Sequence, residues 1–304
     1  MAHLNRHTAP TQYVEAKGTR FAYRRFGNRA GVPLLMNIHF TGTVDHWEPA
    51  VTDGLAAGRE FILFNNAGIS SSSGSIPESV EEMAADAATF IRALGPEPVD
   101  VLCFSMGRLI AQTPAIAEPD LVRRVILAGT GPRSGAGMAT LTPEAQEIFD
   151  AAYGEPDHLW LRVHFSPTET SQATGRAFLE RLGRGTESRD PAANEAVAPG
   201  QLAAFAKWNA PQDNPYAYLL VLSQPTLVVK GDSDVITYTI NSLILRQHIS
   251  NARLIIYPDA NHGSLYQHPE RFMEDVSTFP SGADSRYTRI STRHSRRFNC
   301  DYES

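Results

Sequence analysis

In the stretch VLCFSMGRLI, Val101–Ile110, a single serine separates an apolar run from an apolar-periodic segment. A continuous apolar run such as the one that ends at Phe104 is typical of a strand buried on both faces. The segment after Met106 has the pattern of a helix. Ser105 therefore stands at a predicted strand-to-helix turn, where it is either an activated nucleophile or a helix N-cap.

Apolar β-rich runs alternate with helical patterns on both sides of this turn. The expected strands cover 13–15, 20–26, 33–40, 61–66, 99–104, 124–129, 226–230 and 252–257. The helical patterns cover 80–94, 106–117, 239–249 and 269–278. This alternation predicts an α/β fold with a mostly parallel central sheet and helices on both faces. The first two runs are expected to form an antiparallel hairpin at the sheet's edge.

The alternation of strand and helix patterns stops between Gly131 and Pro215, where helical patterns follow one another with no clear strand. We therefore expect three consecutive parts: a first core part at 1–132, a helical cap insertion at 133–216 and a second core part at 217–280. The remaining segment, 281–304, carries five arginines and few aliphatic residues. Such a composition is typical of a disordered basic tail.

Composition restricts the class of protein. The chain has 304 residues, of which 42% are hydrophobic and 20% charged, and this is enough to bury a large core. No apolar run approaches the roughly 18 residues of a membrane span, and MAHLNRHTAPTQ lacks the apolar region of a secretory signal, so we expect a cytoplasmic protein with no membrane partner. Two cysteines, Cys103 and Cys300, give no metal or disulfide framework. A formal net charge of -6 argues against a nucleic-acid partner.

Two later strand ends carry the residues that an activated serine needs, namely a base and an acid that orients the base. KGDSD, Lys230–Asp234, follows one expected strand, and DANHG, Asp259–Gly263, follows the next. The chain order is therefore serine, aspartate, histidine. Asp234 and His262 lie 28 positions apart (262 − 234), which leaves room for one helix and one strand.

These blocks resemble those of α/β-hydrolase fold proteins, in the branch that uses a serine. The resemblance covers about residues 12–280 and rests on NIHFTGTVDHW (37–47), FNNAGISSSSG (64–74), LCFSMG (102–107), and KGDSD followed by DANHG. The family's nucleophile turn reads G-x-S-x-G. Here Cys103-x-Ser105-x-Gly107 matches half of it.

The resemblance implies a role for each of three residues. Ser105 would be the nucleophile, His262 the general base and then acid, and Asp234 the residue that holds the imidazole tautomer. Asp232 and Asp259 are alternatives for the acid. The family places its acid three residues beyond the glycine, and this favours Asp234.

The resemblance also implies an oxyanion hole formed by the backbone N–H groups of Phe40 and Met106, with Thr41 as the alternative to Phe40. The residues expected to contact substrate are His39, Thr41, Trp160 and Trp208. A large aromatic residue at helical spacing is also typical of a core, so the two tryptophans have that second interpretation.

Several positions depart from the family pattern. Arg108 stands where a second small residue is common, and Pro114 falls inside the helix expected behind the nucleophile. Asn65 and Ala67 replace the acid and the arginine of a loop that relatives often write D-x-R-G. These departures leave open a non-catalytic ligand receptor built on a hydrolase scaffold.

The function that the resemblance implies is an esterase or lactonase that works through an acyl-enzyme and needs no cofactor and no metal. A serine in place of an aspartate disfavours dehalogenase and epoxide hydrolase chemistry. A cofactor-free perhydrolase of the haloperoxidase kind and a carbon–carbon bond hydrolase remain enzymatic alternatives. The apolar helix LWLRVHF, 159–165, in the insertion favours a small, largely apolar ester or lactone as substrate.

Overall fold

The computed structural model describes residues 4–279 apart from 38, 96–97, 108–111, 114, 116 and 186–188. The expectations for Arg108, Pro114 and the basic segment 281–304 fall outside these residues, as does part of the expected helix 106–117. Among the helices within the described ranges, none has the length and apolar character needed to cross a bilayer.

Eight strands form one sheet. They are β1 (Gln12–Ala16), β2 (Thr19–Gly27), β3 (Leu34–Asn37), β4 (Glu60–Phe64), β5 (Val99–Phe104), β6 (Val122–Ala128), β7 (Thr226–Gly231) and β8 (Ala252–Tyr257). Their order is β1-β2-β4-β3-β5-β6-β7-β8. The pairs β1–β2 and β2–β4 are antiparallel and the others are parallel. This confirms the mostly parallel sheet and its edge hairpin.

One strand is shorter than the sequence predicts. The run expected to continue to Phe40 ends as a strand at Asn37. Beyond it the chain turns, because the Gly42 N–H donates to the His39 carbonyl at 3.0 Å and Thr41 adopts a left-handed φ of 55°. His39 and Phe40, which are partly buried, therefore lie in a turn rather than in further sheet.

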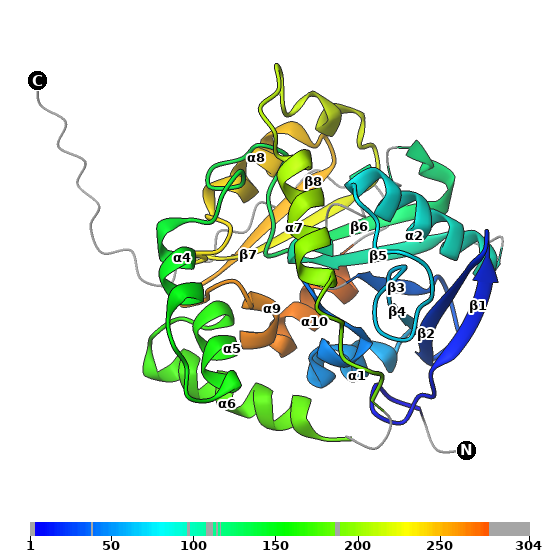
Figure 1. Cartoon of the computed structure of the whole chain (residues 1–304), viewed down its shortest axis with the longest axis horizontal. Coiled ribbons are helices and arrows are strands. Elements are labelled where there is room, and N and C mark those ends of the chain that lie inside the picture. The colour runs from blue at the N-terminus through cyan, green and yellow to red at the C-terminus, as the bar shows by residue number, and fades with distance from the viewer. Residues whose placement is uncertain are drawn as a thin grey trace, which may run out of the picture.

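Helices cover both faces of the sheet (Figure 1). The cluster on one face includes α1 (Pro49–Ala56), α9 (Ser264–Gln267) and α10 (Pro269–Thr278), and the cluster on the other includes α2 (Val80–Leu94) and α8 (Ile240–His248). Side chains of β5 alternate between the two: Val101 and Cys103 pack with α2, whereas Leu102 and Phe104 pack with α1. A strand buried on both faces accounts for the continuous apolar run.

The segment between β6 and β7 supplies four further α-helices, within the 133–216 range that the sequence marks as an insertion. They are α4 (Pro143–Asp150), α5 (Pro156–His164), α6 (Glu169–Gly183) and α7 (Val197–Trp208), and a 3₁₀ helix, η5 (Ala217–Val221), precedes β7. In Figure 1, α4, α5 and α6 lie together beside α9. Arg181 on α6 forms an ion pair of 2.7 Å with the buried Glu48 at the start of α1, and this holds the insertion against the core.

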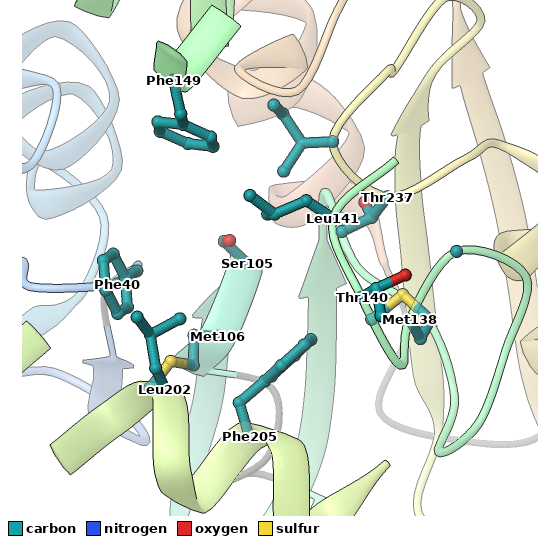
Figure 2. Close-up of a pocket in the computed structure, with 12 residues that line it drawn as sticks. Phe40, Ser105, Met106, Met138, Thr140, Leu141, Phe149, Leu202, Phe205 and Thr237 are labelled. Atoms are coloured by element: carbon teal, nitrogen blue, oxygen red, sulfur yellow. The ribbon is translucent and has the colours of Figure 1, made fainter. Parts of the chain in front are cut away.

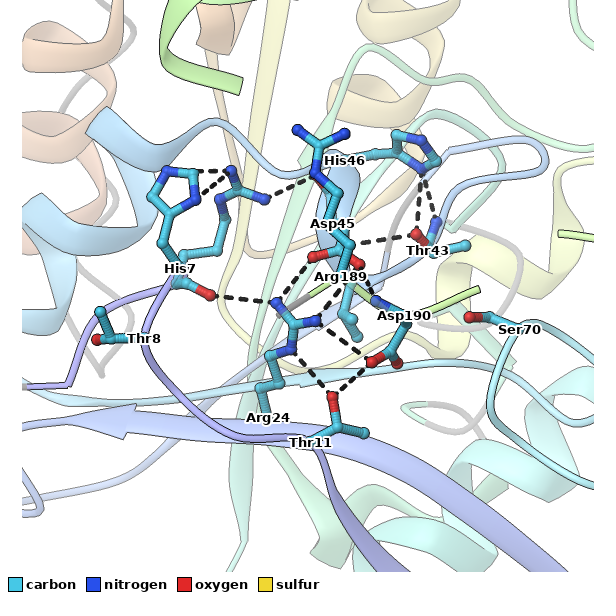
Figure 3. Close-up of polar contacts among 12 residues, drawn as sticks. His7, Thr8, Thr11, Arg24, Thr43, Asp45, His46, Ser70, Arg189 and Asp190 are labelled. Carbon is cyan, nitrogen blue, oxygen red and sulfur yellow. Dashed lines mark hydrogen bonds and ion pairs between the residues drawn. The ribbon is translucent and has the colours of Figure 1, made fainter. Parts of the chain in front are cut away.

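A buried charge network also ties the chain between α6 and α7 to the sheet (Figure 3). The guanidinium of Arg24 on β2 lies 2.8 Å from Asp45 and 3.3 Å from Asp190. The Asp190 N–H donates to the Asp45 carboxylate at 2.8 Å, and the Thr11 hydroxyl donates to Asp190 at 2.5 Å. Buried charges are tolerated when they are paired and hydrogen-bonded in this way.

Candidate active site

Ser105 occupies a strained turn at the carboxyl end of β5. Its φ of 55° is in the left-handed region, which costs free energy for a residue other than glycine and is common at functional turns. A 3₁₀ helix, η2 (Ser105–Gly107), begins at the serine. Cys103, two residues earlier, is fully buried in the core and fits there as a small apolar side chain. The turn therefore forms without the first glycine of the family motif.

The ends of three strands bring Ser105, Asp234 and His262 together. His262 Nε2 lies 2.8 Å from Ser105 Oγ, and His262 Nδ1 lies 3.0 Å from Asp234 Oδ2. Both separations are within hydrogen-bonding distance. With Nδ1 donating to the carboxylate, Nε2 is the acceptor that a serine hydroxyl requires. The arrangement can therefore move a proton from Ser105 to His262.

Asp234 is held as a buried anion. Its Oδ1 accepts the backbone N–H groups of Ile236 at 2.9 Å and Thr237 at 3.0 Å, and Lys230 Nζ lies 2.6 Å from Oδ2. Burial alone would raise the pKa of this carboxyl, but Lys230 and His262 outweigh it and leave the pKa below its ordinary value. The carboxylate that faces His262 is therefore ionised.

The two alternative acids have other partners. Asp232 is exposed and its carboxylate accepts the N–H groups of Asp259 at 3.1 Å and Ala260 at 3.2 Å, which fixes one turn against the next. The carboxylate of Asp259 accepts the hydroxyl of Thr168 at 2.8 Å. Of the three candidates, Asp234 is the one whose carboxylate hydrogen-bonds to His262.

An aromatic cluster packs behind the histidine. The His262 ring lies 5.1 Å from Phe104 and 5.9 Å from His164, measured between centroids. His39 continues the cluster, 5.7 Å from His164 and 5.9 Å from His46. Burial lowers the pKa of His39 to about 3 and of His46 to about 4, and lowers the pKa of His164 well below its ordinary value. His39, His46 and His164 are therefore uncharged at neutral pH.

A cavity of about 330 Å³ opens at Ser105. Its twelve lining residues are Phe40, Ser105, Met106, Gly137, Met138, Thr140, Leu141, Phe149, Leu202, Phe205, Ile236 and Thr237. None of these residues carries a charge. Figure 2 shows the serine hydroxyl among apolar side chains that come from the turns after strands, from the loop before α4 and from α4 and α7. The cavity is suited to an apolar ligand with a few polar atoms near Ser105.

The structure brings both predicted oxyanion residues to this cavity, because Phe40 and Met106 line it together with Ser105. The alternative donor is occupied: the Thr41 N–H donates to Gln201 Oε1 at 2.7 Å. This hydrogen bond between the turn after β3 and α7 leaves Phe40 as the better candidate.

The other predicted contact residues are not among the lining residues. His39 and Trp160 pack against each other with centroids 5.3 Å apart, in the cluster behind Phe104. The guanidinium of Arg133 lies 3.7 Å from the ring centre of Trp208. Both tryptophans therefore make packing contacts, and their contact with a substrate stays a prediction.

Sequence reasoning missed the contributions of α4 and α7 to the cavity. Phe149, Leu202 and the loop residue Leu141 line it and are 44%, 53% and 43% exposed. Exposed apolar side chains that gather at a cavity are typical of a binding site, but their exposure is known only from the fold, so the sequence offered no local signal for them.

Known proteins share this architecture. A family model described as alpha/beta hydrolase fold matches residues 33–269. The solved structure of an alpha/beta hydrolase fold protein from Chitinophaga pinensis is 38% identical, covers 91% of this chain and 98% of its own, and superposes with a TM-score of 0.85.

Two relatives carry more specific names. The protein named "Putative non-heme bromoperoxidase BpoC" of Mycobacterium tuberculosis is 27% identical over 80% of this chain and 91% of its own length. The 2-hydroxy-6-oxononadienedioate/2-hydroxy-6-oxononatrienedioate hydrolase 2 of Pseudomonas putida is 27% identical over 74% of this chain and 78% of its own length. The relatives therefore share the fold while their names indicate different reactions.

Proposed function

Because the chain belongs to the alpha/beta hydrolase fold family, we propose that it is a serine hydrolase that cleaves a small, uncharged, largely apolar carboxylic ester or lactone. The observation that carries this proposal is the hydrogen-bond chain from Asp234 through His262 to Ser105, which ends at an apolar cavity. No cofactor is required for this chemistry.

The reaction begins when Ser105 Oγ attacks the carbonyl carbon and His262 Nε2 takes its proton. Asp234 stabilises the imidazolium that forms, and the N–H groups of Phe40 and Met106 bind the oxyanion. His262 then protonates the leaving alcohol, and an acyl group remains on Ser105. Water, deprotonated by His262, releases the acid and restores the serine.

The cavity indicates the substrate class. A volume of about 330 Å³ is near the lower end for small-molecule sites, so a short or medium acyl chain fits better than a long one. The absence of charge on its twelve lining residues favours an uncharged substrate, because a buried carboxylate without a partner is costly.

The same argument weighs against the carbon–carbon bond hydrolase alternative. The name of the Pseudomonas putida relative specifies a dioate, a substrate with two carboxylates. Such a ligand needs cationic or strongly polar partners, and the described lining residues offer only hydroxyls and backbone groups as polar contacts. An ester or lactone places a single polar carbonyl beside Ser105 and its apolar remainder along the walls.

A second candidate, a cofactor-free perhydrolase, is favoured by the similarity to the protein named as a bromoperoxidase. It would use the same acyl-enzyme, with hydrogen peroxide in place of water releasing a peroxy acid. Bromination of a phenol in acetate buffer with peroxide and bromide tests it. Activity there that exceeds ester hydrolysis would favour this candidate.

The test of the main proposal is hydrolysis of p-nitrophenyl esters from acetyl to octanoyl. We expect Ser105→Ala and His262→Ala to lower kcat by at least about 10³-fold. Asp234→Asn should lower it strongly as well, because the amide favours the wrong imidazole tautomer. Ser75→Ala, at an exposed serine, is the matched control and should retain activity.

Two outcomes would contradict the proposal. The first is a folded wild-type protein that shows no serine-dependent turnover on any ester in the series. The second is a Ser105→Ala variant that hydrolyses esters as fast as the wild type. If the folded protein bound an ester analogue equally well with and without Ser105 and turned over none, a ligand receptor would be the better description.

A further inference from the structure

A buried lysine lies beside the acid of the candidate site. Lys17 and Lys207 are exposed, whereas the side chain of the third lysine of the chain, Lys230, has no exposed surface. Its Nζ lies 2.6 Å from Asp234 Oδ2 and also donates to the carbonyl and hydroxyl oxygens of Thr237. A fully buried lysine is rare because its charge must be desolvated, so a specific partner is needed.

Lys230 acts on the turn that carries Asp234. The residue belongs to β7, while Asp234 and Thr237 lie in the turn that follows. Thr237 closes the arrangement, because its N–H donates to Asp234 Oδ1 and its hydroxyl lies 3.0 Å from Oδ2. The ammonium group therefore holds the carboxylate from the strand side while His262 approaches the same Oδ2 from the other.

The charges around His262 come from few groups. Ser105 and Asp234 contact it from the turns after β5 and β7, and Lys230 on β7 lies against Asp234. His164 faces it from α5, and His39 lies in the turn after β3. Burial lowers the pKa of both neighbouring histidines and raises the pKa of Tyr266 in α9, so these groups are neutral. Among these described groups the ionised ones are Asp234 and Lys230, which cancel.

Asp234 and Lys230 have opposite effects on a proton at the adjacent imidazole. An aspartate alone attracts a proton to the adjacent imidazole, whereas an ammonium bound to the same carboxylate oxygen opposes a second positive charge nearby. Removal of the ammonium would therefore leave the charge of the Asp234 carboxylate unopposed beside the imidazole that activates the serine. Lys230 also keeps the carboxylate ionised at acidic pH, so the imidazole tautomer is maintained.

We propose that Lys230 is a positioning residue that orients Asp234 and, by cancelling its charge, keeps the Ser105 site active at lower pH than the aspartate alone would allow. This inference rests on the proposed serine hydrolase function. A purely structural role, in which the ammonium only caps the Thr237 carbonyl, is the competing explanation. The two explanations differ in the pH profile.

The experiment compares kcat/KM for p-nitrophenyl acetate from pH 4.5 to 9 in wild type, Lys230→Gln, Lys230→Met and Lys230→Arg. Lys17→Gln, at an exposed lysine in the β1–β2 turn, controls for loss of a charge. Circular dichroism at each pH restricts the analysis to folded protein. Labelling of Ser105 by a fluorophosphonate, followed over the same pH range, reports on serine activation without turnover.

We expect the acid limb of both rate profiles to move up by about one to two pH units in Lys230→Gln and Lys230→Met. Lys230→Arg and Lys17→Gln should keep the wild-type limb, and the plateau at pH 8 should stay within about threefold. Superimposable acid limbs, or a lower plateau and lower Tm with an unmoved limb, would overturn the proposal in favour of the structural role.

A measurement on the wild type can still overturn the proposal if both uncharged variants fail to fold. The ¹⁵Nζ resonance of Lys230 distinguishes an ammonium from an amine, and with three lysines in the chain it can be assigned by substituting Lys17 and Lys207. An ammonium from pH 5 to 9 supports the proposal and a neutral amine overturns it. An unlabelled Ser105 at every pH would instead refute the serine hydrolase function, while the ¹⁵N measurement would still report on the lysine.

Discussion

The imidazole of His164 lies parallel to that of His262, with ring centroids 5.9 Å apart and planes inclined by 20°. His164 is 5% exposed, and its carbonyl accepts the Gly263 N–H at 2.9 Å, so α5 supports the loop that carries His262. A Cβ at position 263 would lie 2.7 Å from His164 Cβ, which shows how closely the two segments approach. This packing requires His164 to remain uncharged, so we expect the folded state to be less stable at acidic pH.

We expect the free energy of unfolding to fall as the pH is lowered from about 6.5 to about 4. His39, His46 and His164 have pKa values lowered by burial, so the unfolded chain takes up protons in this range that the folded protein does not. Stability is therefore full above the ordinary histidine pKa and is lost below it, by up to about 1.4 kcal/mol per pH unit for each such histidine. Urea unfolding at intervals of half a pH unit measures the slope.

His164→Phe is the matched variant, because it keeps an aromatic ring at this position and removes one titrating group. Its unfolding free energy should depend on pH less steeply than that of the wild type, by about one proton between pH 6.5 and 4. Equal slopes in the two proteins would show that the buried ring is not the group that resists protonation.

The exposed rim of the cavity should set the chain-length preference. Leu202 is 53% exposed and lines the cavity, so Leu202→Trp can fill the opening without disturbing the core. We expect kcat/KM for the octanoyl ester to fall by about tenfold or more relative to the acetyl ester, measured with p-nitrophenyl substrates. Leu220→Trp, at a 65% exposed leucine of η5 that does not line the cavity, should leave the ratio unchanged.

The sequence was informative wherever a local pattern determines structure. Continuous apolar runs predicted the buried parallel strands, because a strand covered by helices on both faces must be apolar throughout. The ends of β5, β7 and β8 lie at one edge of a parallel sheet, so the order serine, aspartate, histidine was enough to predict that the three residues meet.

The sequence was less informative where tertiary packing decides. The positions of Leu202 and Phe149 over the serine depend on how α7 and α4 dock, and no local pattern encodes this. Trp160 packs against His39, and the sequence could not indicate this contact, since an aromatic residue satisfies a core and a pocket equally well. Lys230 lies in a strand-like run, and only the fold shows its ammonium against Asp234.

The hydrogen bond from the Thr41 N–H to Gln201 should matter for turnover, because Thr41 holds a left-handed φ next to Phe40. Gln201→Leu removes the acceptor and leaves a part-buried N–H unpaired, which costs about 1–3 kcal/mol unless the turn rearranges. We expect kcat to fall about tenfold with KM little changed, since the oxyanion donor acts in the transition state. Gln212→Leu, at an exposed glutamine, is the control. An unchanged kcat in Gln201→Leu would show that the hydrogen bond between Thr41 and Gln201 does not contribute to turnover.

The side chain of Arg24 is 1% exposed, and its guanidinium pairs with both Asp45 and Asp190. Arg24→Met keeps the length of the side chain but leaves two buried carboxylates without this cation, so unfolding should become easier by about 3–5 kcal/mol. Arg29→Met is the matched control, because Arg29 also contacts an acid, Glu60, but its side chain is 78% exposed, and the expected cost there is within about 1 kcal/mol. Urea unfolding at pH 7.5 measures both. Similar costs for the two variants would mean that the Arg24 network adds nothing beyond an ordinary surface ion pair, and that other contacts hold the chain between α6 and α7 to the sheet.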